Sequence, residues 1–280
     1  MYTKKYLPKL VMPAIAAILA IAAYLPTIIW MVDRWLAKES YYGHGFLIPV
    51  ISFYFVWQRR GALKNIKASN DLLGLWVIAI GLLINIVCAS LKVYFISGFS
   101  FIFVIYGLVL FFFGKEMTRN LIFPIFLLLV MIPLPLAIIG TLTVKLKLLA
   151  TQLSVFVLNN IGFRCIRDGS IIRMPGSYLE VAAPCSGLRS IISLLTLGLL
   201  FAYTLKTSYF KKAILFLSSI PIAIGTNVLR ITLVAVVNDL YGEKVALGAF
   251  HDFTGFLVFA FAFLALLGVS KALDTKQERR

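Results

Sequence analysis

Acidic residues are scarce in this chain. Only 11 of its 280 residues are Asp or Glu, against 27 Lys and Arg, and charged residues of all kinds make up 14%. Soluble domains carry about 25% charged residues, so the composition argues against an ordinary soluble enzyme. Hydrophobic residues make up 61%, which predicts an all-α, polytopic membrane protein. Since no stretch is polar enough for a soluble domain, we expect one integral-membrane domain over 1–280.

Signatures of metal and disulfide sites are also missing. The chain has three cysteines, Cys88, Cys165 and Cys185, and two histidines. They form no CxxC motif and no Cys/His cluster, so the sequence predicts no metal and no cofactor. An odd number of cysteines leaves at least one thiol free. Since a disulfide between Cys165 and Cys185 would block the Cys185 thiol, we expect Cys185 to be free and Cys165 to be dispensable.

The formal charge of +16 does not indicate a nucleic-acid partner. The basic residues are scattered through short loops between apolar runs, which is the pattern of membrane orientation. A span needs about 20 apolar residues. Eight segments qualify or nearly qualify, at about 10–32, 45–58, 71–91, 95–113, 119–139, 185–205, 212–237 and 252–270.

Orientation follows from the basic residues. With the N-terminus inside, sixteen Lys and Arg fall on the inner side and nine on the outer, five of these nine in one long connection, 140–183. We therefore expect both termini to be cytoplasmic. Residues 140–160 mix apolar and polar groups, which favours a helix at the membrane interface. A ninth span is the alternative, and it would invert everything downstream.

Turn residues predict a small β-meander on the outer side. Asp168-Gly169 separates two alternating segments and favours a hairpin, and Pro175-Gly176 favours a second turn. We expect this extracytoplasmic meander at about 163–182, leading the chain directly to Cys185.

Cys185 lies in the heptapeptide PCSGLRS, at 184–190, just before a hydrophobic helix predicted over 188–205. A helix N-terminus presents unpaired N–H groups and a partial positive charge, and both favour a thiolate. The simpler alternative is that Cys185 is only a small buried residue.

Two isolated polar residues are predicted at the same depth. Arg230 follows Lys212 by 18 residues, about 27 Å along a helix, which places it in the outer leaflet. His251 opens the last span, also outside. A charge within a span is a functional candidate by default. The alternatives are that Arg230 pairs structurally or reaches the headgroups, and that His251 is an interfacial polar residue.

This set of side chains suits acyl transfer. A cysteine attacks a carbonyl to form a thioester, and a histidine takes the thiol proton and later protonates the leaving amine. The guanidinium of Arg230 can stabilise the oxyanion. Five further residues are candidates for supporting roles: Asn227 to orient the site, Arg189 to hold the thiolate or bind substrate, Asp252 or Glu180 to orient His251, and His44 as a competitor for the base.

Four ordered motifs resemble the exosortase/archaeosortase family of membrane transpeptidases, over most of the chain. They are YGHGFLIP at 42–49, LEV at 179–181 leading into CSGLR at 185–189, NVLRI at 227–231 and HDFTG at 251–255. By this resemblance Cys185, Arg230 and His251 are the catalytic residues. Archaeal members often carry Arg where this chain has His251, which favours the exosortase side.

The resemblance implies a sortase-like cysteine peptidase of the cell inner membrane, with its site on the extracytoplasmic side. Such enzymes process exported proteins whose PEP-CTERM-like tails join a signature motif, a transmembrane helix and basic residues. The other implied partners are membrane lipids and a lipid or cell-envelope acceptor. Two alternatives stay open: a cysteine protease that transfers the acyl group to water, and a non-enzymatic membrane scaffold or transporter. A transporter would need mid-bilayer polar residues on several helices and broken helices in paired halves, and the sequence shows neither.

Overall fold

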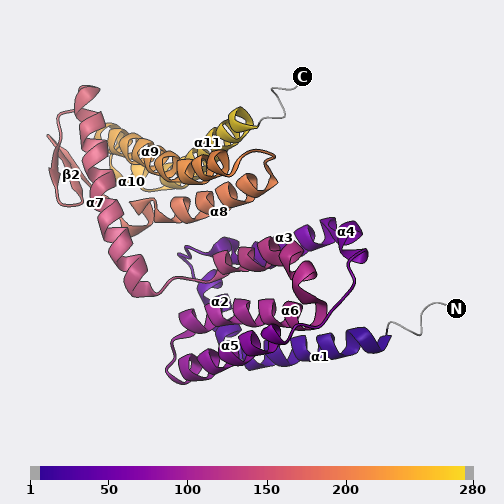
Figure 1. Ribbon diagram of the computed structural model, residues 1–280. Coiled ribbons are helices and arrows are strands. Elements are labelled where there is room, and N and C mark those ends of the chain that lie inside the picture. Colours follow the sequence, from indigo (N-terminus) through magenta and orange to yellow (C-terminus); the bar gives the residue numbers. More distant parts are fainter. Residues whose placement is uncertain (1–6, 275–280) are drawn as a thin grey trace. The chain divides into compact units, whose positions relative to one another are not determined.

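The computed structural model describes residues 7–274, without the side chains of 7–10, 249 and 252. The chain is mostly helical and divides into two compact units, Met1–Pro135 and Leu136–Arg280 (Figure 1). The expectation of one domain over 1–280 stays a prediction.

In its described residues, the first unit consists of helices and the loops between them. Their bounds are α1 Leu7–Ala23, α2 Leu25–Leu36, the 3₁₀ turn η1 Gly43–Phe46, α3 Leu47–Gln58, α4 Arg60–Lys64, α5 Leu72–Ser90, α6 Tyr94–Leu127 and the 3₁₀ turn η2 Leu128–Met131.

The second unit adds a small sheet. It consists of α7 Leu136–Asn160, β1 Ile166–Asp168, β2 Ile171–Met174, β3 Ser177–Glu180, the 3₁₀ turn η3 Ala183–Ser186, α8 Leu188–Thr204, α9 Tyr209–Tyr241, α10 Glu243–Ala246 and α11 Ala249–Leu273.

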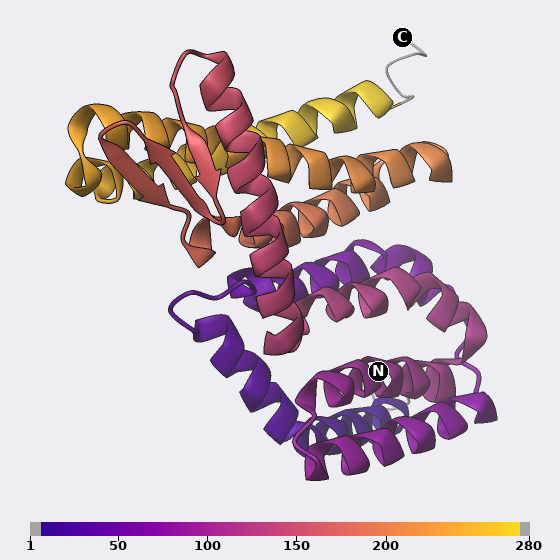
Figure 2. The ribbon, with the colours of Figure 1, turned by 90° about the vertical axis from the view of Figure 1, so that its left-hand side faces the viewer.

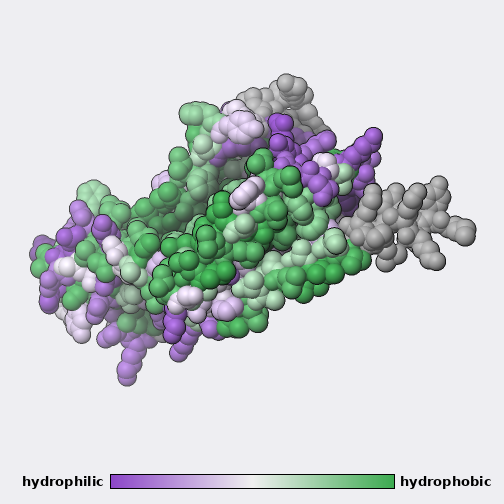
Figure 3. All heavy atoms as spheres, turned by 60° about the horizontal axis from the view of Figure 1, so that its bottom comes forward, coloured by the Kyte–Doolittle hydropathy of each residue, from purple (hydrophilic) through white to green (hydrophobic). Residues whose placement is uncertain are grey.

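Five helical segments in the described chain are long and apolar enough to cross a membrane, and the bent pair α1 and α2 makes a sixth. A multi-pass helical membrane protein is therefore confirmed, but the count of eight spans is not. One reason is that α3 has 12 residues and α8 has 17, which is short for a span. Another is that the predicted segment 119–139 is divided: its first part continues α6, which ends at Leu127, and its last part lies in α7, which begins at Leu136. Hydrophobic residues cover most of the face seen in Figure 3, as lipid-facing helices require.

The first unit contains a broken helix. α1 and α2 meet at Tyr24 with a bend of 64°. At the bend the Tyr24 hydroxyl donates to Gly81 O at 3.0 Å and lies 2.8 Å from Ser100 Oγ, while Ser97 Oγ donates to Asn85 Oδ1 at 2.6 Å. This bend and its polar partners from α5 and α6 were not predicted from the sequence, although a single bent pair is not the paired arrangement of broken helices that a transporter would need. These groups are hydrogen-bonded to one another, so they stabilise the bend.

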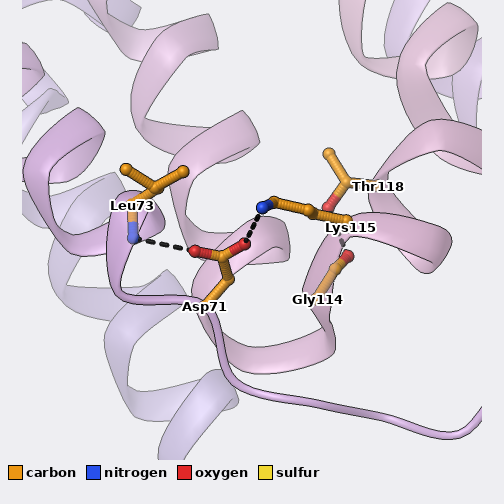
Figure 4. A network of polar contacts seen from close by, with 5 residues as sticks. All are labelled: Asp71, Leu73, Gly114, Lys115 and Thr118. Atoms are coloured by element: carbon orange, nitrogen blue, oxygen red, sulfur yellow. Dashed lines mark hydrogen bonds and ion pairs between the residues drawn. The ribbon is translucent and has the colours of Figure 1, made fainter.

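A second break lies within α6. Gly114 has φ 81° and ψ 177°, a left-handed backbone that favours glycine. The loop before α5 is held next to this break by Asp71. The Asp71 carboxylate accepts from Leu73 N at 3.0 Å and pairs with Lys115 Nζ at 3.4 Å (Figure 4). Thr118 Oγ1 donates to Gly114 O at 2.8 Å. α6 packs on both α5 and α3. Its part before Gly114 corresponds to the expected segment 95–113, whereas the expected segment 119–139 extends past the end of α6 at Leu127.

α7 covers the predicted interfacial segment. By length and composition α7 could also cross a membrane, which was the alternative of a ninth span. In Figures 1 and 2, however, it runs across α8, α9 and α11 rather than alongside them. A helix in the membrane plane would lie this way if those three helices cross the bilayer. The cytoplasmic location of the termini stays a prediction, since 1–6 and 275–280 lie outside the described residues.

The sheet confirms the expected meander. Its order is β1-β2-β3, all antiparallel, with Asp168 opposite Ile171 and Met174 opposite Ser177 at the two turns. β3 is fixed to the end of α9, where Asn238 Nδ2 donates to the Tyr178 carbonyl at 3.1 Å. The buried core beneath joins the sheet to α7 and α9 through Leu158, Ile172, Leu179, Val181, Ile231 and Val234.

Candidate active site

Cys185 lies in η3, the short turn between β3 and α8. Its N–H donates to the Ala182 carbonyl at 2.9 Å. Gly187, with φ +82°, forms the N-cap of α8, and this left-handed backbone favours glycine. The sequence therefore places the thiol immediately before a helix, as expected.

Three elements bring the candidate catalytic side chains together. Cys185 Sγ from η3 lies 2.9 Å from His251 Nε2 on α11. Arg230 on α9 places Nη2 3.0 Å from His251 Nε2 and 3.3 Å from Nδ1, and it donates to the His251 carbonyl at 3.1 Å. The predicted convergence of these three residues is present; their catalytic roles stay predictions.

The electrostatic balance at Cys185 differs from the sequence expectation. Burial raises the pKa of the Cys185 thiol, and the guanidiniums of Arg230 and Arg189 oppose that rise without cancelling it. Burial therefore opposes the thiolate that the helix N-terminus was expected to favour, because desolvation by the apolar surroundings outweighs the nearby positive charge. A protonated thiol needs a base, and His251 lies at hydrogen-bonding distance.

Asn227 supports Cys185 from α9. It is buried, and its Nδ2 donates to the Cys185 carbonyl at 2.8 Å. A Cβ at Gly187 would lie 3.0 Å from the Asn227 amide. This hydrogen bond holds the main chain at Cys185, and the expected orienting role of Asn227 stays a prediction.

The other supporting candidates lie in different places. Arg189 is exposed but close enough to lower the pKa of Cys185. Glu180 lines the same pocket as Cys185 and His251. The side chain of Asp252 lies outside the described residues. His44 belongs to the first unit, where it stacks on Tyr42 and burial lowers its pKa.

A pocket of 230 Å³ opens beside the thiol. Cys185, Arg230, His251 and Glu180 contribute its polar groups. The rest of its lining is Leu179, Val181, Ala182, Ile231, Val234 and Leu247.

One family model, described as Transmembrane exosortase (Exosortase_EpsH), matches residues 30–268. This match spans most of the chain and includes all three candidate catalytic residues. The chain belongs to the transmembrane exosortase family. No curated protein and no solved structure matches the chain.

One residue of this exosortase site was missed by the sequence reasoning. Gly255 lies four residues after His251 on α11, so both share a helix face. A Cβ there would lie 3.0 Å from Arg230 Nη2, so the absent side chain leaves room for the guanidinium. The i, i+4 spacing within the HDFTG motif was the signal available.

The three cysteines of the exosortase chain are free, as expected for Cys185. Cys165 is buried beneath the sheet, and its thiol donates to the Val155 carbonyl at 3.7 Å. Its dispensability stays a prediction. Within the described residues, no group of three or more His, Cys, Asp and Glu side chains could hold a metal ion.

Proposed function

We propose that this exosortase is a membrane cysteine transpeptidase that cleaves the C-terminal sorting tails of exported proteins at the extracytoplasmic face. The observation that carries the proposal is the 2.9 Å contact between Cys185 Sγ and His251 Nε2, with Arg230 Nη2 next to the same imidazole. A nucleophile hydrogen-bonded to its base is the arrangement that covalent catalysis needs.

Cleavage begins with proton transfer. Because burial keeps the thiol protonated, His251 Nε2 accepts its proton as the sulfur attacks the scissile carbonyl. A C–S bond forms and the carbonyl electrons move to its oxygen. When the tetrahedral intermediate collapses, the C–N bond breaks and the imidazolium protonates the departing amine. The products are a thioester on Cys185 and a released transmembrane tail.

Arg230 stabilises the negative charge of the intermediate. Its guanidinium cannot deprotonate at physiological pH, and Nη2 lies one hydrogen-bond distance from the ring nitrogen that faces the sulfur. Its Nε is buried and has no hydrogen-bond partner among the described residues. A buried donor without a partner is costly, so a substrate oxygen that accepts from it would bind favourably.

The thioester then passes to an acceptor. An acceptor hydroxyl or amine attacks the carbonyl, His251 removes its proton, and the C–S bond breaks to restore the thiol. When the acceptor is a lipid or cell-envelope component, the enzyme acts as a transpeptidase. With water as the acceptor, the same groups would perform hydrolysis.

The test uses a secreted reporter fused to a tail that contains a signature motif, a transmembrane helix and basic residues. The tail comes from an exported protein of the same genome. Cys185→Ala and Cys185→Ser should abolish maturation in cells, while the protein still inserts. Cys165→Ser is the matched control and should keep it.

The mass of the mature C-terminus separates the two acceptors, because transpeptidation leaves an added group and hydrolysis leaves a free carboxylate. Normal maturation with Cys185→Ala would overturn the assignment of Cys185 as the nucleophile. The interpretation as a non-enzymatic scaffold or transporter would then remain.

A further inference from the structure

The pocket beside Cys185 has an aliphatic wall that the chemistry of bond cleavage does not require. Five of its lining side chains are branched and apolar: Leu179 from β3, Val181 directly after β3, Ile231 and Val234 from α9, and Leu247 after α10. At 230 Å³, it is smaller than the roughly 300–1,000 Å³ of a typical small-molecule site. It therefore suits a short peptide segment rather than a whole ligand.

At Glu180, the outer edge of β3 presents main-chain groups that are unpaired within the described chain, beside the same pocket. Val181 N donates to the Ser170 carbonyl, on the side of β2. Neighbouring residues of an antiparallel strand alternate in direction, so the N–H and C=O of Glu180 point away from β2. Tyr178, two residues earlier, points the same way, because its carbonyl accepts from Asn238.

These two main-chain groups of Glu180 have no partner among the residues the structure describes. Unpaired edge groups of a strand are the template for adding another strand. Glu180 lines the pocket together with the nucleophile, so a peptide paired to this edge would run toward Cys185.

We propose that the substrate peptide binds in an extended conformation on the outer edge of β3, paired to the main chain of Glu180. One uncharged aliphatic side chain on its acyl side then fills the pocket between Val181, Val234 and Leu247. This inference rests on the proposed function, because it assigns the recognition of the segment that Cys185 attacks.

The choice of an uncharged side chain follows from the lining. A carboxylate or ammonium seated between Val181, Val234 and Leu247 would lose its hydration among branched aliphatic groups, which is costly. Main-chain pairing supplies affinity without regard to side chains, and the pocket supplies the specificity.

The test uses peptidyl vinyl sulfones, which alkylate the thiol next to a chosen side chain. A series would carry alanine, valine, leucine, lysine or glutamate at the position nearest the sulfone. Labelling of Cys185 in the purified full-length protein is followed by mass spectrometry. Each rate is divided by that for iodoacetamide, which normalises for the reactivity of the thiol itself.

Wild type should prefer valine or leucine over lysine and glutamate by about 10-fold or more, the scale at which apolar pockets discriminate. Leu247→Glu should shift the preference toward lysine, and Leu247→Lys toward glutamate. Leu247 is 45% exposed, so both variants are expected to fold. Val245, which is also exposed and does not line the pocket, provides the control Val245→Glu. Equal rates for all side chains, or equal effects at Leu247 and Val245, would overturn the pocket assignment.

Strand pairing is tested on the unmodified enzyme. A probe in which one amide is replaced by an ester loses the N–H that would donate to the Glu180 carbonyl. Its relative rate should fall about 3- to 10-fold at that position, the net value of one hydrogen bond, and remain unchanged at the next position. Glu180→Pro, which removes the N–H that would donate to a peptide carbonyl, should lower peptide labelling more than Glu180→Ala. Ester probes with equal rates at every position would refute the pairing.

Failure here is distinguishable from failure of the proposed function. If reporter maturation needs Cys185 while the probes show no side-chain or ester dependence, only the recognition mode is wrong. If maturation does not need Cys185, the proposed function is wrong, whatever the probes show.

Discussion

Gly255 and Arg230 are in contact between α11 and α9, and a Cβ at Gly255 would lie 3.0 Å from Arg230 Nη2 and 3.2 Å from Cζ. Such a separation is too close for a methyl group unless the guanidinium moves. Since Arg230 also contacts both ring nitrogens of His251, movement of the guanidinium would change the surroundings of the base. Gly255 is therefore a positioning residue of the site.

We expect Gly255→Ala to lower reporter maturation by about 10- to 100-fold, the scale of a misplacement near 1 Å. The same change should not unfold the protein, because alanine favours a helix over glycine by about 1 kcal/mol. The matched control is Gly268→Ala on the same helix, where a Cβ meets nothing within 4 Å. Maturation rates and thermal unfolding would be measured for both. Equal activity in the two variants would contradict the role of Gly255.

Asn227→Asp tests the support of the nucleophile. The change keeps the shape of the side chain but places an acceptor where Nδ2 now donates to the Cys185 carbonyl at 2.8 Å. Loss of this buried hydrogen bond should cost about 1–3 kcal/mol of stability and lower maturation. Denaturant unfolding and reporter assays would measure both. Asn160→Asp, at an exposed amide that donates only within its own helix, should have a much smaller effect on either quantity.

The reactivity of Cys185 should depend on pH in a defined direction. Because burial raises its pKa, the thiolate fraction is small near neutrality and increases with pH. The rate of iodoacetamide labelling should still be rising above pH of about 8.5, the pKa of an unperturbed thiol. Arg230→Gln removes the larger of the two opposing positive charges and should move the profile to higher pH, and Arg189→Gln should move it less in the same direction. A plateau below neutral pH would instead indicate a preformed thiolate–imidazolium pair.

The two histidines should differ in importance. His251 contacts the thiol directly, whereas His44 lies in the other compact unit and stacks on Tyr42. We expect His251→Ala to remove most maturation, by about 100-fold or more for loss of a general base, and His44→Ala to leave much more. Comparison of the two variants at equal expression is the measurement. The reverse order would transfer the base role to His44.

The sequence was sufficient to predict that three side chains converge but not the electrostatics around them. Cys185 was identified from its place before a helix, and Arg230 and His251 as isolated polar residues at the same expected depth. The Asp168-Gly169 turn indicated the meander. The raised pKa of Cys185 could not be predicted, because it depends on aliphatic side chains from β3 and α9 that meet only in the folded chain. The bend at Tyr24 was missed for a similar reason, since its polar partners come from α5 and α6.

The central claim is that Cys185 forms a thioester with the substrate. Purified enzyme would be mixed with the reporter, quenched in acid and digested, and the peptide that contains Cys185 analysed by mass spectrometry. We predict an acyl adduct on Cys185 that neutral hydroxylamine releases and that is missing in Cys185→Ser. Complete maturation of the reporter without any adduct on Cys185, or the same adduct on Cys165, would contradict the account.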